Sequence, residues 1–248
     1  ARFFVMEFVD GHAIRSVADA EQLSLETRGA IGPHMAATLA NLHRINPDEV
    51  GLGDLARKDA YVARQLKRWR GQLEAMTLQG ETHTTGVLAL GDRLAESIPE
   101  QQAVAFVHGD YRLDNLIIGE NGSVKAILDW ELCTLGDPMA DLGMLWVYWP
   151  EPGEELGSLE EFSATTAQGF CPRTELIEAY AQYSDLDLSE LPYYRALALW
   201  RLACILQGVY RRTSEGAGGG NDSSVDNFPA HIALLARLGE VALEERSR

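Results

Sequence analysis

The chain has 248 residues, of which 46% are hydrophobic and 23% are charged. This composition is that of a globular protein with a substantial core, and it excludes a disordered or fibrous chain. The formal net charge of -16 argues against a nucleic-acid partner, because a protein needs a long basic face to neutralise the phosphate backbone of a nucleic acid. If the chain binds a nucleotide, its phosphates must meet metal ions or a few local cations.

The first elements predicted along the chain are a strand and three helices. Residues 3–9 are rich in Phe and Val and are followed by Asp10-Gly11, which predicts a strand and a turn. Ser24 is a good N-cap for a helix that ends before Asn46-Pro47, and Pro33 is expected to kink or delay this helix. Two amphipathic helices follow, at residues 59–76 and 85–98.

Strand-like runs appear in the middle of the chain and helices follow them to its end. The runs at residues 116–118 and 124–128 are separated by the turn Glu120-Asn121-Gly122, which predicts a small hairpin beside a further run at 103–107. The glycine-rich segment 216–224 lacks the Lys-Ser/Thr of a phosphate-binding loop and is interpreted as a connector. Helices are predicted from Pro138 to Tyr148 and at residues 174–183, 189–212 and 229–245.

The cysteines and the apolar runs favour the cytoplasm. Cys133, Cys171 and Cys204 are widely separated and show no Cys-x-x-Cys spacing, so neither a zinc site nor a disulfide framework is predicted. The longest apolar runs are too short for a membrane span or contain an arginine. We therefore expect a cytoplasmic protein with no membrane partner.

Three polar residues after predicted strands carry the chemistry. Asp110 lies in a loop after a buried strand, where a carboxylate can accept the proton of an attacking hydroxyl. Asn115 offers an amide oxygen to a metal ion, and Asp129, at the end of an apolar strand, is the principal candidate ligand of Mg2+. Phosphoryl transfer from ATP needs such a base and such ligands, together with a cation on the phosphates. The ordered pattern predicts a phosphotransferase that uses ATP and Mg2+.

Several neighbouring residues have structural interpretations. His108 is expected to hold backbone groups of its loop, and His43 to pack or cap at the end of its helix. Asp137 precedes Pro138 as a helix N-cap, and Asp141 is expected in the first helical turn, where it can also tie the loop that contains Asp110.

Two segments resemble a known family. Residues 108–115 read His-Gly-Asp-Tyr-Arg-Leu-Asp-Asn, and residues 127–131 read Ile-Leu-Asp-Trp-Glu. Together they resemble the catalytic segments of aminoglycoside phosphotransferases and choline kinases. Residues 129–143 and 200–212 make the kinase-like domain associated with acyl-CoA dehydrogenases the nearest resemblance, over essentially the whole chain. The resemblance implies an α+β, protein-kinase-like fold, mainly its helix-rich C-terminal lobe with a hinge strand and a small catalytic hairpin.

The same resemblance divides the chain at residue 11. Residues 1–11 are expected to be the hinge strand, and residues 12–248 the catalytic lobe. The resemblance implies that a β-rich lobe with the phosphate-binding Lys precedes the hinge, so we expect the chain by itself to be inactive as a kinase. The residues expected to bind the adenine of ATP are Met6, Glu7, Phe8 and Val9.

The substrate contacts and the acceptor remain open. Arg112 is the best cation in the loop for a phosphate or an anionic substrate, and Arg201 lies on a helix that in the family faces the acceptor. Asp114 and Glu131 can reach metal or substrate, but pairing with a base such as Arg112 is favoured for both. The resemblance implies a small hydroxyl-bearing substrate, for which a hydroxyacyl or hydroxyacyl-CoA acceptor is favoured over an aminoglycoside. The alternatives are a non-catalytic pseudokinase or nucleotide-binding module partnered with an acyl-CoA dehydrogenase, and a magnesium-dependent phosphohydrolase.

Overall fold

Helices form most of the structure, a computed structural model that describes residues 6–154, 163–215 and 227–246. The α-helices are α1 (Val17–Glu21), α2 (Leu25–Arg44), α3 (Tyr61–Met76), α4 (Thr85–Glu96), α5 (Met139–Val147), α7 (Arg173–Ala181), α8 (Leu191–Ser214) and α9 (Phe228–Glu245). The strands are β1 (Ala105–Val107), β2 (Leu116–Ile118), β3 (Val124–Ile127) and β4 (Thr134–Gly136). Short 3-10 helices span Leu113–Asn115, Trp130–Leu132, Ala164–Thr166 and Leu188–Glu190.

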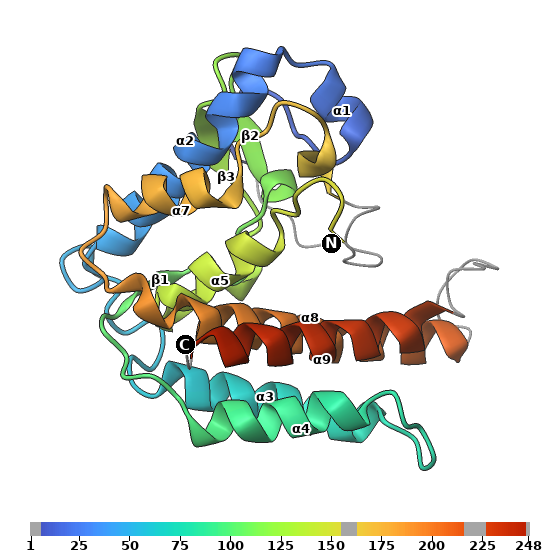
Figure 1. Cartoon of the computed structure of the whole chain (residues 1–248). Coiled ribbons are helices and arrows are strands. Elements are labelled where there is room, and N and C mark those ends of the chain that lie inside the picture. The colour runs from blue at the N-terminus through green and yellow to red at the C-terminus, as the bar shows by residue number, and fades with distance from the viewer. Residues whose placement is uncertain (1–5, 155–162, 216–226, 247–248) are drawn as a thin grey trace.

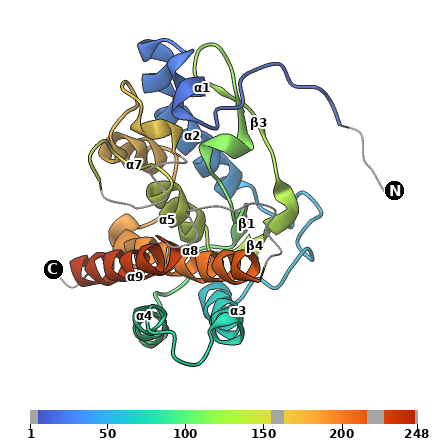
Figure 2. The same cartoon turned by 90° about the vertical axis from the view of Figure 1, so that its right-hand side faces the viewer.

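The helices lie in tiers (Figure 1). Helices α8 and α9 pack side by side, with α3 and α4 against them on one side and α5 against α8 on the other. Beyond α5 lie α1, α2, α7 and the β2–β3 hairpin, as the perpendicular view also shows (Figure 2). No helix in the described ranges is long and apolar enough to cross a membrane.

Large aromatic side chains fill the core without leaving their polar atoms unpaired. Six of them are almost fully buried; the Tyr180 hydroxyl bonds His43, and each of the other five donates a hydrogen bond to an oxygen elsewhere in the chain. This pairing removes the cost of burying a polar group, so the rings contribute their full apolar area to stability. The pairs are Tyr111 with Met35 O, Trp149 with Cys171 O, Tyr193 with Leu94 O, Tyr194 with Asp137 Oδ2 and Trp200 with Val87 O.

The predicted long helices are confirmed, with ends within two residues of the predicted ones. Ser24 caps α2 by accepting a hydrogen bond from the Thr27 N–H, as its position predicts. Pro33 lies inside α2 without interrupting it, so the prediction that it delays the helix is wrong. The one-turn helix α1 was not predicted, because five residues are too few for a visible period.

The predicted hairpin is confirmed, but it accounts for only half of the strand pairing. Strands β2 and β3 are antiparallel, with Leu116 opposite Ile127. The second pair, β1 with β4, places Ala105 opposite Gly136, and β4 has no recognisable strand signal in its three residues. Because β1 leads into the Asp110 loop and β4 follows the Asp129 segment, this pairing brings the two segments together.

The N-terminal strand is not confirmed where the structure describes it. Met6 to Asp10 form no strand, and the side chains of Met6 and Phe8 are 63% and 88% exposed. An extended segment becomes a strand only by hydrogen bonding to a neighbour, and here pairing starts at the bridge between His12 and Ile118. Residues 3–5 of the predicted strand, and nearly all of the predicted connector at 216–224, lie outside the described residues.

Two glycines make a matched test of the packing between α5 and α8. A Cβ at Gly143 would lie 2.4 Å from the backbone oxygen of Tyr194, whereas a Cβ at Gly71, in the middle of α3, meets nothing within 4 Å. We expect Gly143→Ala to lower the free energy of unfolding by about 1–3 kcal/mol through overpacking. Gly71→Ala should raise it by about 0.5–1 kcal/mol, because alanine loses less backbone entropy than glycine in a helix. Urea unfolding measures both, and a Gly143→Ala variant as stable as the parent would contradict the tight crossing.

Candidate active site

A buried carboxylate fixes the backbone of the loop that follows β1. Asp141, in the first turn of α5, is fully buried, and its Oδ2 and Oδ1 accept hydrogen bonds from the backbone N–H groups of His108 (2.6 Å) and Gly109 (2.8 Å). The prediction that Asp141 ties this loop is therefore confirmed. Two bonds to one charged acceptor hold both the position and the orientation of the peptide before Asp110.

A histidine and a tyrosine extend this tie to two other helices. His43, in the last turn of α2, lies with Nε2 3.4 Å from Asp141 Oδ2 and with Nδ1 2.7 Å from the Tyr180 hydroxyl on α7. The His43 side chain is only 3% exposed. Its packing role is confirmed, but the partners are distant in sequence and no local pattern indicated them.

His108 joins the loop to the segment before Asp129. Its Nε2 donates to the backbone oxygen of Leu128 (2.8 Å), while its Nδ1 accepts from the Asp110 N–H (3.3 Å), which is the pattern of a neutral imidazole. The Leu128 N–H in turn donates to the backbone oxygen of Asn115 (2.8 Å). The anchoring role predicted for His108 is confirmed. Asp129 directly follows Leu128, which is bonded to both ends of the segment 108–115.

Asp110 and Asn115 are in direct contact. The Asn115 amide Nδ2 donates to Asp110 Oδ2 and to the Asp110 backbone oxygen, both at 2.9 Å. Burial raises the pKa of the Asp110 carboxyl above its ordinary value, while the charges of Arg112 and Arg201 and the Asn115 hydrogen bond oppose this rise. One carboxylate oxygen of Asp110 is thus held in place, and the amide oxygen of Asn115 is left for another partner.

Asp129 has an unusual backbone conformation. Its φ and ψ of 63° and 55° lie in the left-handed region, which among non-glycine residues of the described ranges only Ala60 shares. The next residue, Trp130, donates from its indole N–H to Ile127 O, and its ring packs edge-on against the His108 ring. These contacts hold the backbone turn that leaves the Asp129 side chain exposed.

The predicted pairing of Arg112 is confirmed for one carboxylate and wrong for the other. Arg112 forms a double hydrogen bond with Asp114, and its guanidinium lies 4.8 Å from the Tyr148 ring centroid. Glu131 forms no ion pair among the described residues; it lies beyond Asp129, on another cavity from the one Arg112 lines. The two residues are separated because the chain turns sharply at Asp129.

Two cavities flank the loop. One, of about 260 Å³, is lined by Arg112 and Asp114 together with Arg15 and Tyr148. The other, of about 280 Å³, is lined by Gly109, by Glu131 and its neighbours, and by residues of α3 and α8 that include Arg201. The loop with Asp110 therefore borders open space on two sides.

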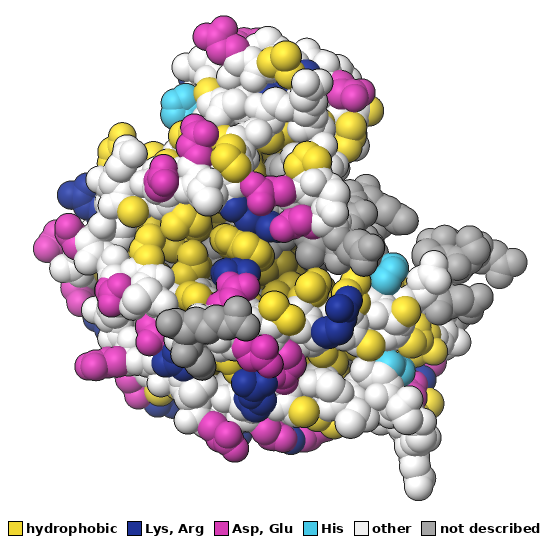
Figure 3. Space-filling view, viewed as in Figure 1, with side chains coloured by type: hydrophobic (Ala, Val, Ile, Leu, Met, Phe, Trp, Pro, Cys, Tyr) yellow, Lys and Arg dark blue, Asp and Glu magenta, His cyan; other side chains and the backbone are white. Residues whose placement is uncertain are grey.

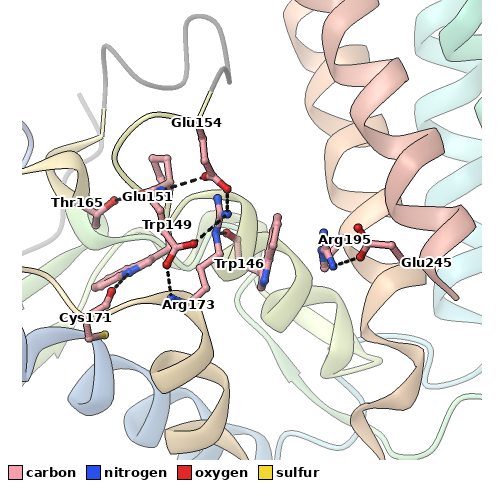
Figure 4. Close-up of polar contacts among 10 residues, drawn as sticks. Trp146, Trp149, Glu151, Glu154, Thr165, Cys171, Arg173, Arg195 and Glu245 are labelled. Carbon is pink, nitrogen blue, oxygen red and sulfur yellow. Dashed lines mark hydrogen bonds and ion pairs between the residues drawn. The ribbon is translucent and has the colours of Figure 1, made fainter. Parts of the chain in front are cut away.

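Arg173 supports the segment beside the first cavity (Figure 4). Its backbone N–H bonds Glu151, its guanidinium pairs with Glu154, and its Nε donates to the backbone oxygen of Trp146. The same guanidinium stacks on the Trp146 ring, whose centroid also lies 3.7 Å from the Arg195 guanidinium. Arg173 is 4% exposed, so a buried cation ties the turn after α5 to the start of α7.

The remaining predicted site residues are the metal ligands and the adenine contacts. In the described ranges, no group of three or more His, Cys, Asp or Glu side chains is placed to hold a metal ion. Met6 to Phe8 are exposed and Val9 is half-buried, and the described segment runs outward from the body near β3 (Figure 2).

The profile of the phosphotransferase enzyme family matches residues 1–200. The chain belongs to this family. The human protein named acyl-CoA dehydrogenase family member 11 is 34% identical over 255 residues, which cover 99% of this chain and 31% of the human protein. The chain thus spans about a third of the length of the curated relatives it matches.

Solved structures described as an aminoglycoside phosphotransferase and a choline kinase share the fold. A Ralstonia eutropha protein assigned as an aminoglycoside phosphotransferase has a TM-score of 0.77 and 28% identity, covering 97% of this chain and 72% of that one. A choline kinase of Cryptosporidium parvum has a TM-score of 0.63 over 97% of this chain and 71% of its own, at 14% identity, which shows likeness of fold alone. The predicted kinase-like fold, mainly its helix-rich C-terminal lobe, is confirmed. Family and fold agree: the chain belongs to the phosphotransferase enzyme family and has a kinase-like fold.

Asp141 allows a direct test of how the loop is held. We expect Asp141→Asn to lower the free energy of unfolding by about 1–3 kcal/mol, because its amide NH2 would face a backbone N–H that loses its acceptor. The His108 and Gly109 amides should exchange with solvent deuterium faster than in the parent, as measured by native-state hydrogen exchange. Asp185→Asn makes the same change on an exposed carboxylate and should alter neither quantity. Unchanged exchange at both amides in Asp141→Asn would show that the tie does not hold the loop.

Proposed function

We propose that this protein transfers the γ-phosphoryl group of ATP to a hydroxyl group of a small molecule, with Asp110 as the base. The observation that carries the proposal is the contact between Asp110 and Asn115, backed by the backbone bond from Leu128 that brings Asp129 next to them. The proposed base and the proposed metal ligands Asn115 and Asp129 thus lie on connected segments, which suits phosphoryl transfer.

Asp110 acts as the acceptor of the hydroxyl proton. The Asn115 amide binds Oδ2, which leaves Oδ1 for the acceptor hydroxyl. A carboxylate whose pKa is raised by burial is a stronger base than an exposed one, so the partial burial of the loop assists proton transfer. The rigid loop behind it keeps the carboxylate in a fixed position, and positioning is the main protein contribution to this class of reaction.

Asn115 and Asp129 are the proposed ligands of Mg2+. The residues fit this ion: one amide oxygen and one exposed carboxylate are hard oxygen donors, and two protein ligands suit an ion that keeps waters and binds substrate phosphates. When bound, Mg2+ neutralises charge on the transferring phosphate. The left-handed backbone conformation at Asp129 leaves its carboxylate exposed and free to bind an ion.

Met6, Glu7, Phe8 and Val9 are the proposed contacts of the adenine ring. Support comes from the bridge between His12 and Ile118, which attaches the end of this segment to the hairpin that links Asn115 to Asp129. Arg112 is the proposed contact of a phosphate or of an anionic substrate. Its link to Asp114 orients the guanidinium, which keeps donors for a further partner.

A hydroxyacyl or hydroxyacyl-CoA acceptor is proposed in preference to an aminoglycoside. The support is the 34% identity to a human protein named for acyl-CoA dehydrogenases, which also makes such a dehydrogenase the proposed partner of this domain. The three cysteines are unpaired thiols, in keeping with a proposed location in the reducing cytoplasm.

Asp110→Asn in the natural protein tests the base. We expect kcat for ATP-dependent phosphorylation of the acceptor to fall by about 10²–10⁴-fold, because the amide cannot take the hydroxyl proton. The Kd for ATP, measured by isothermal titration calorimetry, should stay within about two-fold of the parent value. Asp185→Asn serves as the control with unchanged turnover. Normal turnover in Asp110→Asn would refute the assignment.

Asp129→Asn tests the metal site. We expect the Mg2+ concentration for half-maximal activity to rise by at least about 10-fold, because the amide removes the only charged protein ligand proposed. Glu131→Gln removes the next carboxylate along the chain and should leave the Mg2+ requirement unchanged. The opposite pattern, a shift in Glu131→Gln alone, would move the ligand assignment to Glu131.

A further inference from the structure

Two arginines from different helices converge on one tryptophan in the cavity beside Gly109. The guanidinium carbons of Arg68, on α3, and Arg201, on α8, lie 5.4 and 5.3 Å from the Trp69 ring centroid. All three side chains line the cavity of about 280 Å³. The stacking orients both cations on the same apolar surface.

Neither arginine has a carboxylate partner within 4.0 Å in the described part of the chain. Other arginines do: Arg70, Arg195 and Arg211 each pair with a glutamate. The Nε of Arg201 is also buried without any hydrogen-bond partner. A buried N–H group without a partner is costly, so the Arg201 guanidinium favours an anion beside it. Two arginines that share one cavity without an acidic partner among the described residues add to this attraction.

The cavity also borders both halves of the candidate active site. Gly109 precedes Asp110, while Glu131 and Leu132 follow Asp129 closely, and all three line the cavity. The charge of Arg201 reaches Asp110, where it lowers the pKa of the carboxyl against the effect of burial. With Glu131 counted, the lining keeps one net positive charge on a surface where acidic side chains are scattered widely (Figure 3).

We propose that Arg68 and Arg201 bind an anionic group of the acceptor, a carboxylate or a phosphate, and thereby select acidic hydroxylated substrates. The proposal rests on the proposed kinase function and names its substrate class. Trp69 supplies an apolar wall for a short acyl chain, and the small volume suits an acid of a few carbons. A polycationic aminoglycoside is disfavoured there, because its amines would meet two guanidinium groups.

The test measures binding and turnover separately on the natural protein. The panel comprises 2-, 3- and 4-hydroxybutanoate, the methyl ester of each, 3-hydroxybutanoyl-CoA and kanamycin. We expect at least one acid or the CoA thioester to bind more tightly than the uncharged esters and kanamycin, measured by calorimetry. Arg68→Gln and Arg201→Gln should each weaken that binding by about 10- to 100-fold, the loss of a hydrogen bond to a charged group. Ester binding and ATP binding should not change.

Three variants control the interpretation. Lys67→Gln removes a cation from the neighbouring exposed position of α3, outside the cavity lining, and should bind as the parent does. Arg201→Lys keeps the charge and should restore part of the binding. Since Arg68 is exposed, Arg68→Gln should keep the parent melting temperature even if Arg201→Gln does not fold.

The outcomes distinguish the proposed anion subsite from the proposed kinase function. If binding of the free acids depends on the arginines, the subsite holds a carboxylate. If binding of the CoA thioester depends on them, the subsite holds a phosphate of CoA. Either result supports the proposal. Equal binding by parent and both glutamine variants, or no anion that binds more tightly than the esters, overturns it. Arginine-dependent binding without any phosphate transfer from ATP would leave the anion subsite standing and refute the kinase function.

Discussion

The contact between the Asp141 carboxylate and the backbone N–H groups of His108 and Gly109 is the constraint on which the rest of the candidate site depends. Both bonds are buried, and each hydrogen bond to a charged group contributes about 1.5–3 kcal/mol, so the peptide before Asp110 has essentially one position. His43 and Tyr180 support the carboxylate from α2 and α7. Side chains from three helices, α2, α5 and α7, thus hold a single backbone segment.

From that fixed segment, hydrogen bonds extend to the second motif, residues 127–131. His108 holds the backbone oxygen of Leu128, and the Leu128 N–H holds Asn115. The β1–β4 pair joins the same two segments on the far side of Asp129. The strained turn at Asp129 is therefore held at both ends, which is the condition under which such backbone strain persists.

The two cavities beside the loop differ in whether their arginines have acidic partners. Arg112 is satisfied by Asp114 and Tyr148 and faces the cavity walled by the turn that Arg173 supports. Arg68 and Arg201 face the other cavity without acidic partners among the described residues. Glu131 lines the same cavity but pairs with neither arginine, so the lining keeps a net positive charge in a chain that is acidic as a whole.

Local patterns in the sequence were sufficient for the long helices, the β2–β3 hairpin and the identity of Asp110, Asn115 and Asp129 as a candidate set. These features depend on caps, turns and motif spacing, which are properties of neighbouring residues. Tertiary structure alone decided the β1–β4 pair, the partners of His43, the separation of Glu131 from Arg112 and the meeting of Arg68 with Arg201. Each of these joins residues far apart in the chain, or depends on a turn at Asp129 that aspartate does not by itself require. Their geometry follows from packing, which no local window of sequence contains.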